Sequence, residues 1–420
     1  MPMTILAALC LLLNPSLPLQ GPLHSFVSAP EPDRSFRRVS SGEGVAEFRL
    51  VSQKWKDRLW SHSLVVVSPK KLVHTDTVLL VITGDRVDRS DQPLAHALAE
   101  ASGMRVAMLF DVPNQPLWGM REDEIIAHSF AQYMGTGDAS WPLLMPMAKS
   151  AAAAMDALSG RISGGASLDP QPKKFVVTGA SKRGWTTWLV GALGDPRVIG
   201  LAPAVFDFLD FPSQLKRQLE LWGGYSEMIG DYTELGLQQA LETDRGKELQ
   251  RAVDPVHALA SIRVPILALT GANDRYWATD ATRLYWDRLP SPKALSITPN
   301  AGHSLGDGQR AIAAIGAFAN AAARKSALPE VRGRWNPDTS TYEARTEGAK
   351  PRAWTVWVAE EDSLDFRTSV WRARELEDGP SASFVAKPGE RSVAFFLEAR
   401  FEGAGRAFTL ATPIRIVPKK

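Results

Sequence analysis

The sequence contains very little cysteine and histidine, and this excludes several kinds of site. Cys10 is the only cysteine among 420 residues, so neither a disulfide framework nor a cysteine-rich metal site can form. The seven histidines show no His-Glu-x-x-His motif and no paired spacing typical of metal ligands. We therefore expect no bound metal and no cofactor.

The chain also lacks a charge excess of either sign and a hydrophobic run long enough to cross a membrane. Its net charge is +2, from 48 basic and 46 acidic residues that are intermixed, which indicates neither a nucleic-acid partner nor a membrane surface. The apolar run from Thr4 to Leu13 is too short for a bilayer and is typical of a signal peptide. We interpret residues 1–29 as a signal peptide and leader, and we expect an exported protein, periplasmic or secreted, without a membrane span after processing.

Regular alternation of strand and helix patterns defines the main domain. Residues 30–44 are polar and predicted to be a linker, and two antiparallel strands are expected before Val78. Strands then alternate with helices as far as Ala323, which predicts a mostly parallel sheet with helices on both faces. We assign this domain to residues 45–328.

Two further segments depart from this alternation. Residues 208–260 form a long, largely helical and aromatic excursion, which we interpret as a cap over the active site; the alternative is a packed helical decoration. After Leu328, short strand-like segments separated by turns predict a small β-sandwich domain over residues 329–420.

A serine stands between a predicted strand and a predicted helix. The apolar run before Gly179 is typical of a buried strand, and helical spacing of apolar residues begins after Gly184. Ser181 thus lies on a tight strand-to-helix turn, like the nucleophile elbow of an α/β-hydrolase. The usual motif is Gly-x-Ser-x-Gly, whereas Arg183 occupies the second glycine position here. The alternative is a serine in an ordinary β-to-α turn, such as a helix N-cap.

The histidine partner follows from chain order, because α/β-hydrolases present their triad as serine, acid, histidine. Only His257 and His303 come after Ser181. His257 lies in the predicted cap. His303 follows the last predicted strand and precedes the last helix, where such a fold places its general base, so we predict that His303 is the base.

The acid is expected on the loop after the preceding strand. Asp274 stands there, at the sheet edge where ligand sites gather in open α/β sheets. We predict that His303 takes the proton of Ser181, which attacks an acyl carbon while Asp274 orients the imidazole. Asp207 and Asp210, after an earlier strand, are the alternative acids.

The oxyanion hole and the substrate contacts are predicted from neighbouring loops. One oxyanion donor is expected to be the backbone N–H of Lys182, and the other to come from the loop near Gly84 and Asp85. The side chains of Lys182 and Arg183 are either solvated at the start of a helix or contact the oxyanion or an anionic substrate. The predicted substrate-binding residues are Asn114, Gln115, Arg183 and Trp185.

These residues form an ordered set that resembles the PhoPQ-activated pathogenicity-related family over roughly Glu47 to Thr412. The resemblance implies an α/β-hydrolase fold and export, and it does not identify a substrate. Gly84-Asp85 departs from the two glycines expected there. The elbow is also similar to that of glucuronoyl esterases, where a cation follows the serine as Lys182 does here. The motifs that carry the family resemblance are Val112-Pro113-Asn114-Gln115-Pro116-Leu117, Thr136-Gly137-Asp138 with Trp141-Pro142, Gly179-Ala180-Ser181-Lys182-Arg183-Gly184-Trp185, Asp254-Pro255 and Pro299-Asn300-Ala301-Gly302-His303.

Two hypotheses of different class follow. The first is an exported serine hydrolase that cleaves a small-molecule ester, a carbohydrate ester or a peptide bond. The second is a catalytically silent exported binding or signalling protein on a hydrolase scaffold. The ordered triad favours the first, and the altered elbow and Gly84-Asp85 favour the second. The sequence does not indicate an oligomeric state.

Overall fold

A computed structural model describes residues 21–85, 91–162, 167–387, 389–403 and 406–420. Most of the predicted leader, residues 1–20, lies outside the described residues. Within the described part of the chain, no helix is long and apolar enough to cross a bilayer.

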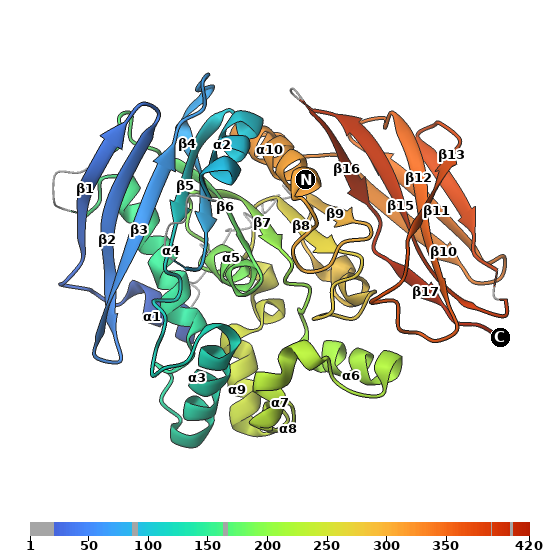
Figure 1. The fold of residues 1–420 in the computed structure, drawn as a ribbon, viewed down its shortest axis with the longest axis horizontal. Coiled ribbons are helices and arrows are strands. Elements are labelled where there is room, and N and C mark those ends of the chain that lie inside the picture. The colour runs from blue at the N-terminus through green and yellow to red at the C-terminus, as the bar shows by residue number, and fades with distance from the viewer. Residues whose placement is uncertain (1–20, 86–90, 163–166, 388, 404–405) are drawn as a thin grey trace, which may run out of the picture.

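A nine-stranded sheet forms the centre of the molecule (Figure 1). Its strands pair in the order β1 (Ser35–Gly42), β2 (Val45–Trp55), β3 (Arg58–Val67), β5 (Met104–Leu109), β4 (His74–Ile82), β6 (Lys174–Ala180), β7 (Val198–Ala204), β8 (Ile266–Gly271) and β9 (Lys293–Thr298). The first three strands and the β3–β5 pair are antiparallel, and every pair from β5 to β9 is parallel. Strands β5 and β8 are buried along their whole length, as expected for strands covered on both faces.

Helices cover both faces of this sheet and form two apolar cores. Leu80 of β4 packs in the core that contains α3 (Glu122–Thr136), α4 (Leu144–Leu158) and α5 (Lys182–Ala192). Its neighbour Leu79 packs in the core that contains α2 (Asp91–Ser102) and α10 (Gln309–Ala323). Successive side chains of a strand point to opposite faces, so one strand contributes to both cores. This architecture confirms the predicted α/β-hydrolase fold.

The excursion after β7 is helical, as predicted. It consists of α6 (Phe211–Trp222), η1 (Glu227–Ile229), α7 (Gly230–Glu234), α8 (Leu237–Ala240), α9 (Asp244–Val253) and η2 (Pro255–Ser261). In Figure 1 these yellow-green elements gather below the sheet, beside α3.

Two antiparallel sheets follow α10 and form the C-terminal sandwich. One contains β10 (Glu330–Asn336), β11 (Thr341–Glu347) and β14 (Ser381–Val385). The other contains β12 (Ala353–Glu361), β13 (Arg372–Leu376), β15 (Ser392–Glu402), β16 (Ala407–Ala411) and β17 (Arg415–Val417). Strand β16 lies against β9 and α10, so the sandwich is packed on the last elements of the main domain.

Two predicted elements are wrong. The linker over residues 30–44 contains β1, whose Phe36 is buried and stacks on Phe48 of β2 at 4.8 Å between ring centroids. The predicted alternation also places a helix between β8 and β9, over residues 279–289, but this stretch consists of two 3₁₀ segments, η3 (Ala281–Leu284) and η4 (Trp286–Arg288). Side chains three residues apart eclipse in a 3₁₀ segment, which lets Thr282 and Tyr285 both bond the same buried carboxylate.

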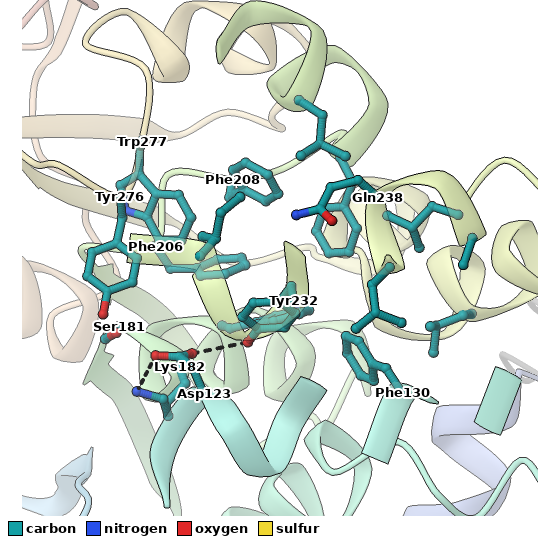
Figure 2. Close-up of a pocket in the computed structure, with 18 of the residues that line it drawn as sticks. Asp123, Phe130, Ser181, Lys182, Phe206, Phe208, Tyr232, Gln238, Tyr276 and Trp277 are labelled. Atoms are coloured by element: carbon teal, nitrogen blue, oxygen red, sulfur yellow. Dashed lines mark hydrogen bonds and ion pairs between the residues drawn. The ribbon is translucent and has the colours of Figure 1, made fainter. Parts of the chain in front are cut away.

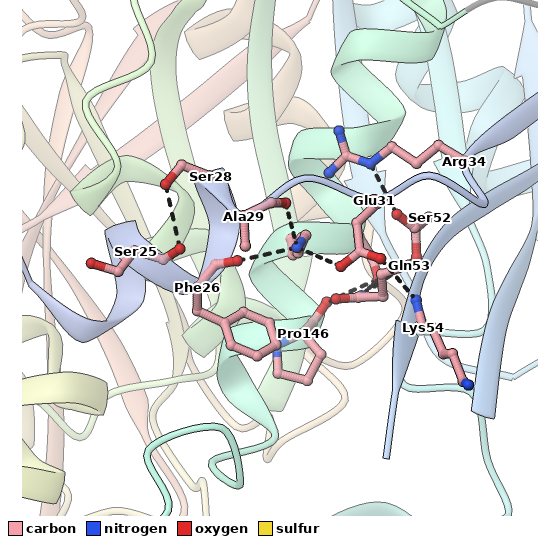
Figure 3. Close-up of polar contacts among 12 residues, drawn as sticks. Ser25, Phe26, Ser28, Ala29, Glu31, Arg34, Ser52, Gln53, Lys54 and Pro146 are labelled. Carbon is pink, nitrogen blue, oxygen red and sulfur yellow. Dashed lines mark hydrogen bonds and ion pairs between the residues drawn. The ribbon is translucent and has the colours of Figure 1, made fainter. Parts of the chain in front are cut away.

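The last part of the predicted leader forms the helix α1 (Pro22–Ser28), and the leader boundary at residue 29 stays a prediction. Figure 3 shows the polar contacts that hold this segment. The ammonium of Lys149 on α4 is 1% exposed and donates to the carbonyls of Phe26 at 3.2 Å and Ala29 at 2.9 Å, and to the Glu31 carboxylate at 2.6 Å. One buried cation therefore holds the segment against α4.

We expect Lys149→Met to lower the free energy of unfolding by about 3 kcal/mol, because it leaves the Glu31 carboxylate, whose side chain is 13% exposed, without its counter-charge. Urea unfolding at pH 7 measures this loss. The control is Lys174→Met, which breaks a half-exposed ion pair with Asp76 and is expected to cost less than about 1 kcal/mol. Equal losses in the two variants would contradict the assigned role of Lys149.

Candidate active site

Ser181 occupies a strained turn between β6 and α5. Its backbone has φ 60° and ψ −127°, a conformation that residues other than glycine rarely adopt. Glycines make the close approach possible: a Cβ on Gly179 would lie 2.6 Å from the Arg183 carbonyl oxygen, and one on Gly184 would lie 2.4 Å from the Ala204 carbonyl oxygen. The displaced second glycine therefore still serves the tight packing that an elbow requires.

The acid and the base that the sequence predicts are hydrogen-bonded to each other. Asp274 follows β8 and His303 follows β9, and the Asp274 Oδ2 to His303 Nδ1 distance is 2.8 Å. The second carboxylate oxygen accepts the backbone N–H of Tyr276 at 3.0 Å, which fixes the orientation of the buried Asp274 side chain. A carboxylate at Nδ1 favours the tautomer with the proton on that nitrogen, which leaves Nε2 as an acceptor. Nε2 is buried and has no hydrogen-bond partner among the described residues.

Ser181 opens into a pocket next to this pair. It lines the pocket together with Tyr276 and Trp277, and Figure 2 shows Tyr276 and Ser181 at the same end. The Tyr276 ring lies 4.3 Å from the His303 ring between centroids. Within the described structure no hydrogen bond joins His303 Nε2 to Ser181.

The pocket is almost entirely apolar and aromatic. Counting the solvent at its mouth, it has about 780 Å³ of unfilled space. The main domain contributes Asp123, Phe130, Met134, Ser181, Lys182, Trp185, Phe206, Tyr276 and Trp277. The helical excursion contributes Phe208, Phe211, Leu215, Ile229, Tyr232, Leu237, Gln238, Ala240, Leu241 and Leu249. Because the excursion supplies about half of the lining residues, it forms a wall of the pocket that contains Ser181.

Of the residues predicted to bind substrate, Trp185 lines the pocket. Its ring stacks on Phe206 at 4.7 Å between centroids, and its indole N–H donates to the Val253 carbonyl at 2.5 Å. Trp185 on α5 therefore contacts the last residue of α9. Its contact with substrate stays a prediction.

Lys182 and Arg183 are engaged with carboxylates rather than solvated. Lys182 is 6% exposed, with its ammonium 2.6 Å from Glu122 and 3.2 Å from Asp123. The Arg183 guanidinium forms two bonds to the Glu122 carboxylate, at 2.7 and 2.8 Å, and a third to the Val112 carbonyl. The predicted contact of either cation with an anionic substrate would have to compete with these internal pairs.

Glu122 compensates both cations, and its ionisation depends on them. Burial alone would raise the pKa of Glu122, but the hydrogen bonds and charge of Arg183, together with Lys182, outweigh it and hold the pKa well below the ordinary value. A carboxyl with a depressed pKa stabilises the fold above its ordinary pKa of 4.5, and this stabilisation is lost as the pH falls toward the folded-state pKa.

We expect Glu122→Gln to lower the free energy of unfolding at pH 7 by about 2 kcal/mol, less than for a fully buried pair because the Glu122 side chain is 38% exposed. The difference from the wild type should shrink as the pH falls below about 4.5. Denaturant unfolding between pH 7 and pH 3 measures both effects. Glu124→Gln removes an exposed charge from the same helix turn and should change stability little; a difference that is independent of pH would contradict the ion-pair account.

The other predicted loop residues hold the backbone near the elbow. Asn114 accepts the N–H of Ser61 and donates to the Asp111 carbonyl, both at 2.7 Å. Gln115 bonds the side chains of Asp85 and Glu122, and Arg121 also pairs with Asp85. These contacts account for the polar groups of Asn114 and Gln115 without a substrate.

Gly84 lies against the Arg183 guanidinium, where a Cβ would come within 2.4 Å of a guanidinium nitrogen. The close approach of Arg183 explains why residue 84 is a glycine. The oxyanion roles predicted for Gly84, Asp85 and Lys182 rest on their backbone N–H groups and stay predictions.

The alternative acids have partners other than His303. Asp207 is buried and accepts hydrogen bonds from the hydroxyls of Thr282 and Tyr285, and burial raises its pKa to about 6. Asp210 pairs with Arg288, and His257 is exposed in η2. Within the described residues, no cluster of three or more His, Cys, Asp or Glu could hold a metal ion.

The C-terminal sandwich reaches the candidate site through its β12–β13 loop. Asn273, one residue before the predicted acid, donates to the Ser369 carbonyl at 2.8 Å. Asn300, three residues before the predicted base, accepts the backbone N–H of Trp371 at 2.7 Å and donates to its carbonyl at 2.9 Å. The sequence analysis missed this role for the sandwich. The loops that present acid and base are thus both supported by the second domain.

The chain is similar to a curated protein, to solved structures and to one protein family. The chain is 30% identical over 306 residues to the autocrine proliferation repressor protein A of Dictyostelium discoideum, covering 68% of this chain and 61% of that protein's length. Among solved structures, an acetyl xylan esterase from Paenibacillus sp. R4 has a TM-score of 0.47 and 14% identity, covering 67% of this chain and 86% of that one. An S-formylglutathione hydrolase from Agrobacterium tumefaciens has a TM-score of 0.44 and 13% identity, covering 69% and 98%. Residues 35–367 match the family described as PhoPQ-activated pathogenicity-related protein, and the chain therefore belongs to that family.

Proposed function

We propose that the protein is a serine hydrolase that cleaves an ester or peptide bond through an acyl-enzyme intermediate. The observation that carries this proposal is the 2.8 Å bond between Asp274 and His303, which leaves a buried imidazole nitrogen free beside the pocket into which Ser181 opens. A strained serine, an oriented base and an apolar pocket are together what acyl transfer needs.

The proposed reaction assigns one role to each group. His303 Nε2 takes the proton of Ser181 as its oxygen attacks the acyl carbon, and Asp274 stabilises the resulting imidazolium. The oxyanion is held by the backbone N–H of Lys182, at the start of α5, and by a backbone N–H near Gly84 and Asp85. His303 then gives its proton to the leaving group. A water molecule that loses a proton to His303 attacks the acyl carbon of the acyl-enzyme, and His303 returns the proton to Ser181 as the acid is released.

A carbohydrate ester is one alternative within this reading, suggested by the cation after the serine. The Lys182 ammonium is paired with two carboxylates, however, and the pocket has few free polar groups for sugar hydroxyls. We therefore favour a less polar ester or a peptide.

The second candidate is a catalytically silent binding or signalling protein. The name of the Dictyostelium relative, a proliferation repressor, favours it, although this chain spans only 61% of that protein. We also keep export as a proposal, based on the apolar N-terminal run.

A fluorophosphonate probe separates the two candidates. A serine hydrolase should be labelled at a single site in the wild type and not in Ser181→Ala. Folded wild-type protein that takes up no probe would favour the silent candidate.

A further inference from the structure

The helical excursion places one amide side chain in the lining of the pocket, away from Ser181. Gln238 lies on α8, is 6% exposed and lines the pocket. Figure 2 shows Ser181 and Tyr276 on one side of the pocket and Gln238 across from them, with aromatic rings between. A group attached to Ser181 as an acyl chain would therefore extend toward Gln238.

The orientation of the Gln238 amide follows from its neighbour. The Thr233 hydroxyl donates to the Ile229 carbonyl at 3.1 Å, so its oxygen is an acceptor for Gln238 Nε2 at 2.8 Å. This leaves Gln238 Oε1 as an acceptor. Oε1 is buried and has no hydrogen-bond partner among the described residues. A buried acceptor without a donor is costly, so a ligand that supplies the donor gains affinity.

Away from the hydroxyls of Ser181 and Tyr276, the other charged and hydroxyl groups of the pocket are already paired. Lys182 is balanced by Glu122 and Asp123, and Asp123 also accepts the Tyr232 hydroxyl at 3.0 Å. Apart from the reacting Ser181 end, the described lining thus offers apolar walls and one free acceptor. A charged group would lack a counter-charge there, and a polyhydroxylated sugar would leave most of its hydroxyls unpaired.

We propose that this pocket binds an uncharged apolar or aromatic group that ends in a hydrogen-bond donor, a hydroxyl or an N–H, which Gln238 Oε1 accepts. The inference rests on the proposed function, since it takes the bound group to be the acyl part of the substrate. It names the substrate class as esters or amides of hydroxyaryl or similar ω-donor acids.

The test compares pairs of esters that differ only in the terminal group. The substrates are 4-nitrophenyl esters of ω-(4-hydroxyphenyl)alkanoic acids of increasing chain length, each paired with its 4-methylphenyl analogue. For at least one length, we expect the wild type to prefer the hydroxyl member in kcat/KM by about 10-fold or more. Gln238→Met should abolish that preference, and Gln239→Met, at an exposed position on the same helix, should keep it. Circular dichroism checks that both variants fold.

Failure of this inference can be told from failure of the proposed function. Turnover without a hydroxyl preference at any length, or a preference that survives in Gln238→Met, would overturn the inference and leave the hydrolase intact. For an inactive wild type, calorimetric binding of the free 4-hydroxyphenyl and 4-methylphenyl alkanols is measured instead. A preference for the hydroxyl member that Gln238→Met removes would support the inference without catalysis, and equal binding would overturn it.

Discussion

Ser181→Ala is expected to lower turnover of any ester that the wild type hydrolyses by about 10⁴-fold or more. The serine oxygen is the proposed nucleophile, and its removal leaves only the oxyanion donors and the pocket to assist attack by water. Because Ser181 lies at φ 60°, alanine should fold there as serine does, with the same backbone strain. Steady-state hydrolysis of 4-nitrophenyl acetate measures the loss.

Ser213→Ala is the matched control for this substitution. Ser213 lies on α6 but is not among the residues that line the pocket, so its removal should leave turnover within about two-fold of the wild type. A loss of only a few-fold in Ser181→Ala would rule out Ser181 as the nucleophile.

Asp274→Asn is expected to lower kcat by about 10⁴-fold with little change in stability. The asparagine can still accept the Tyr276 N–H, but an amide nitrogen facing His303 Nδ1 favours the tautomer with the proton on Nε2. That tautomer cannot accept the serine proton. The kcat of the variant at its optimum pH, with thermal unfolding in parallel, measures the effect.

Asp207→Asn provides the comparison for the acid. Asp207 is also buried near the end of a parallel strand, but its carboxylate is taken up by Thr282 and Tyr285. We expect this variant to retain most of its activity. The opposite order, with Asp207→Asn inactive and Asp274→Asn active, would transfer the acid role to Asp207.

The sequence predicted the parts of the site that depend on chain order and local pattern. Parallel strands end at one edge of the sheet, so loops after successive strands meet there; this brought Asp274 and His303 together although they are 29 positions apart. The family resemblance is likewise confirmed, because it rests on contiguous motifs.

Hydrogen bonds and ion pairs between residues far apart in the chain could not be predicted from local pattern or chain order. Nothing local indicates that Glu122 binds Arg183, 61 positions away, or that Asn300 bonds the backbone of Trp371. Strand β1 was missed because Phe36 is its only buried residue, which leaves no alternating pattern to detect. Gln238 was missed since its role depends on burial within a short polar helix.

Direct detection of the acyl-enzyme tests the central claim most closely. The wild type is mixed with 4-nitrophenyl acetate, quenched in acid during turnover, and digested for mass spectrometry. The account predicts an acetyl group on the peptide that contains Ser181, which disappears in Ser181→Ala. Product formation without an acetyl group on Ser181, or with a turnover-dependent one elsewhere, would contradict it.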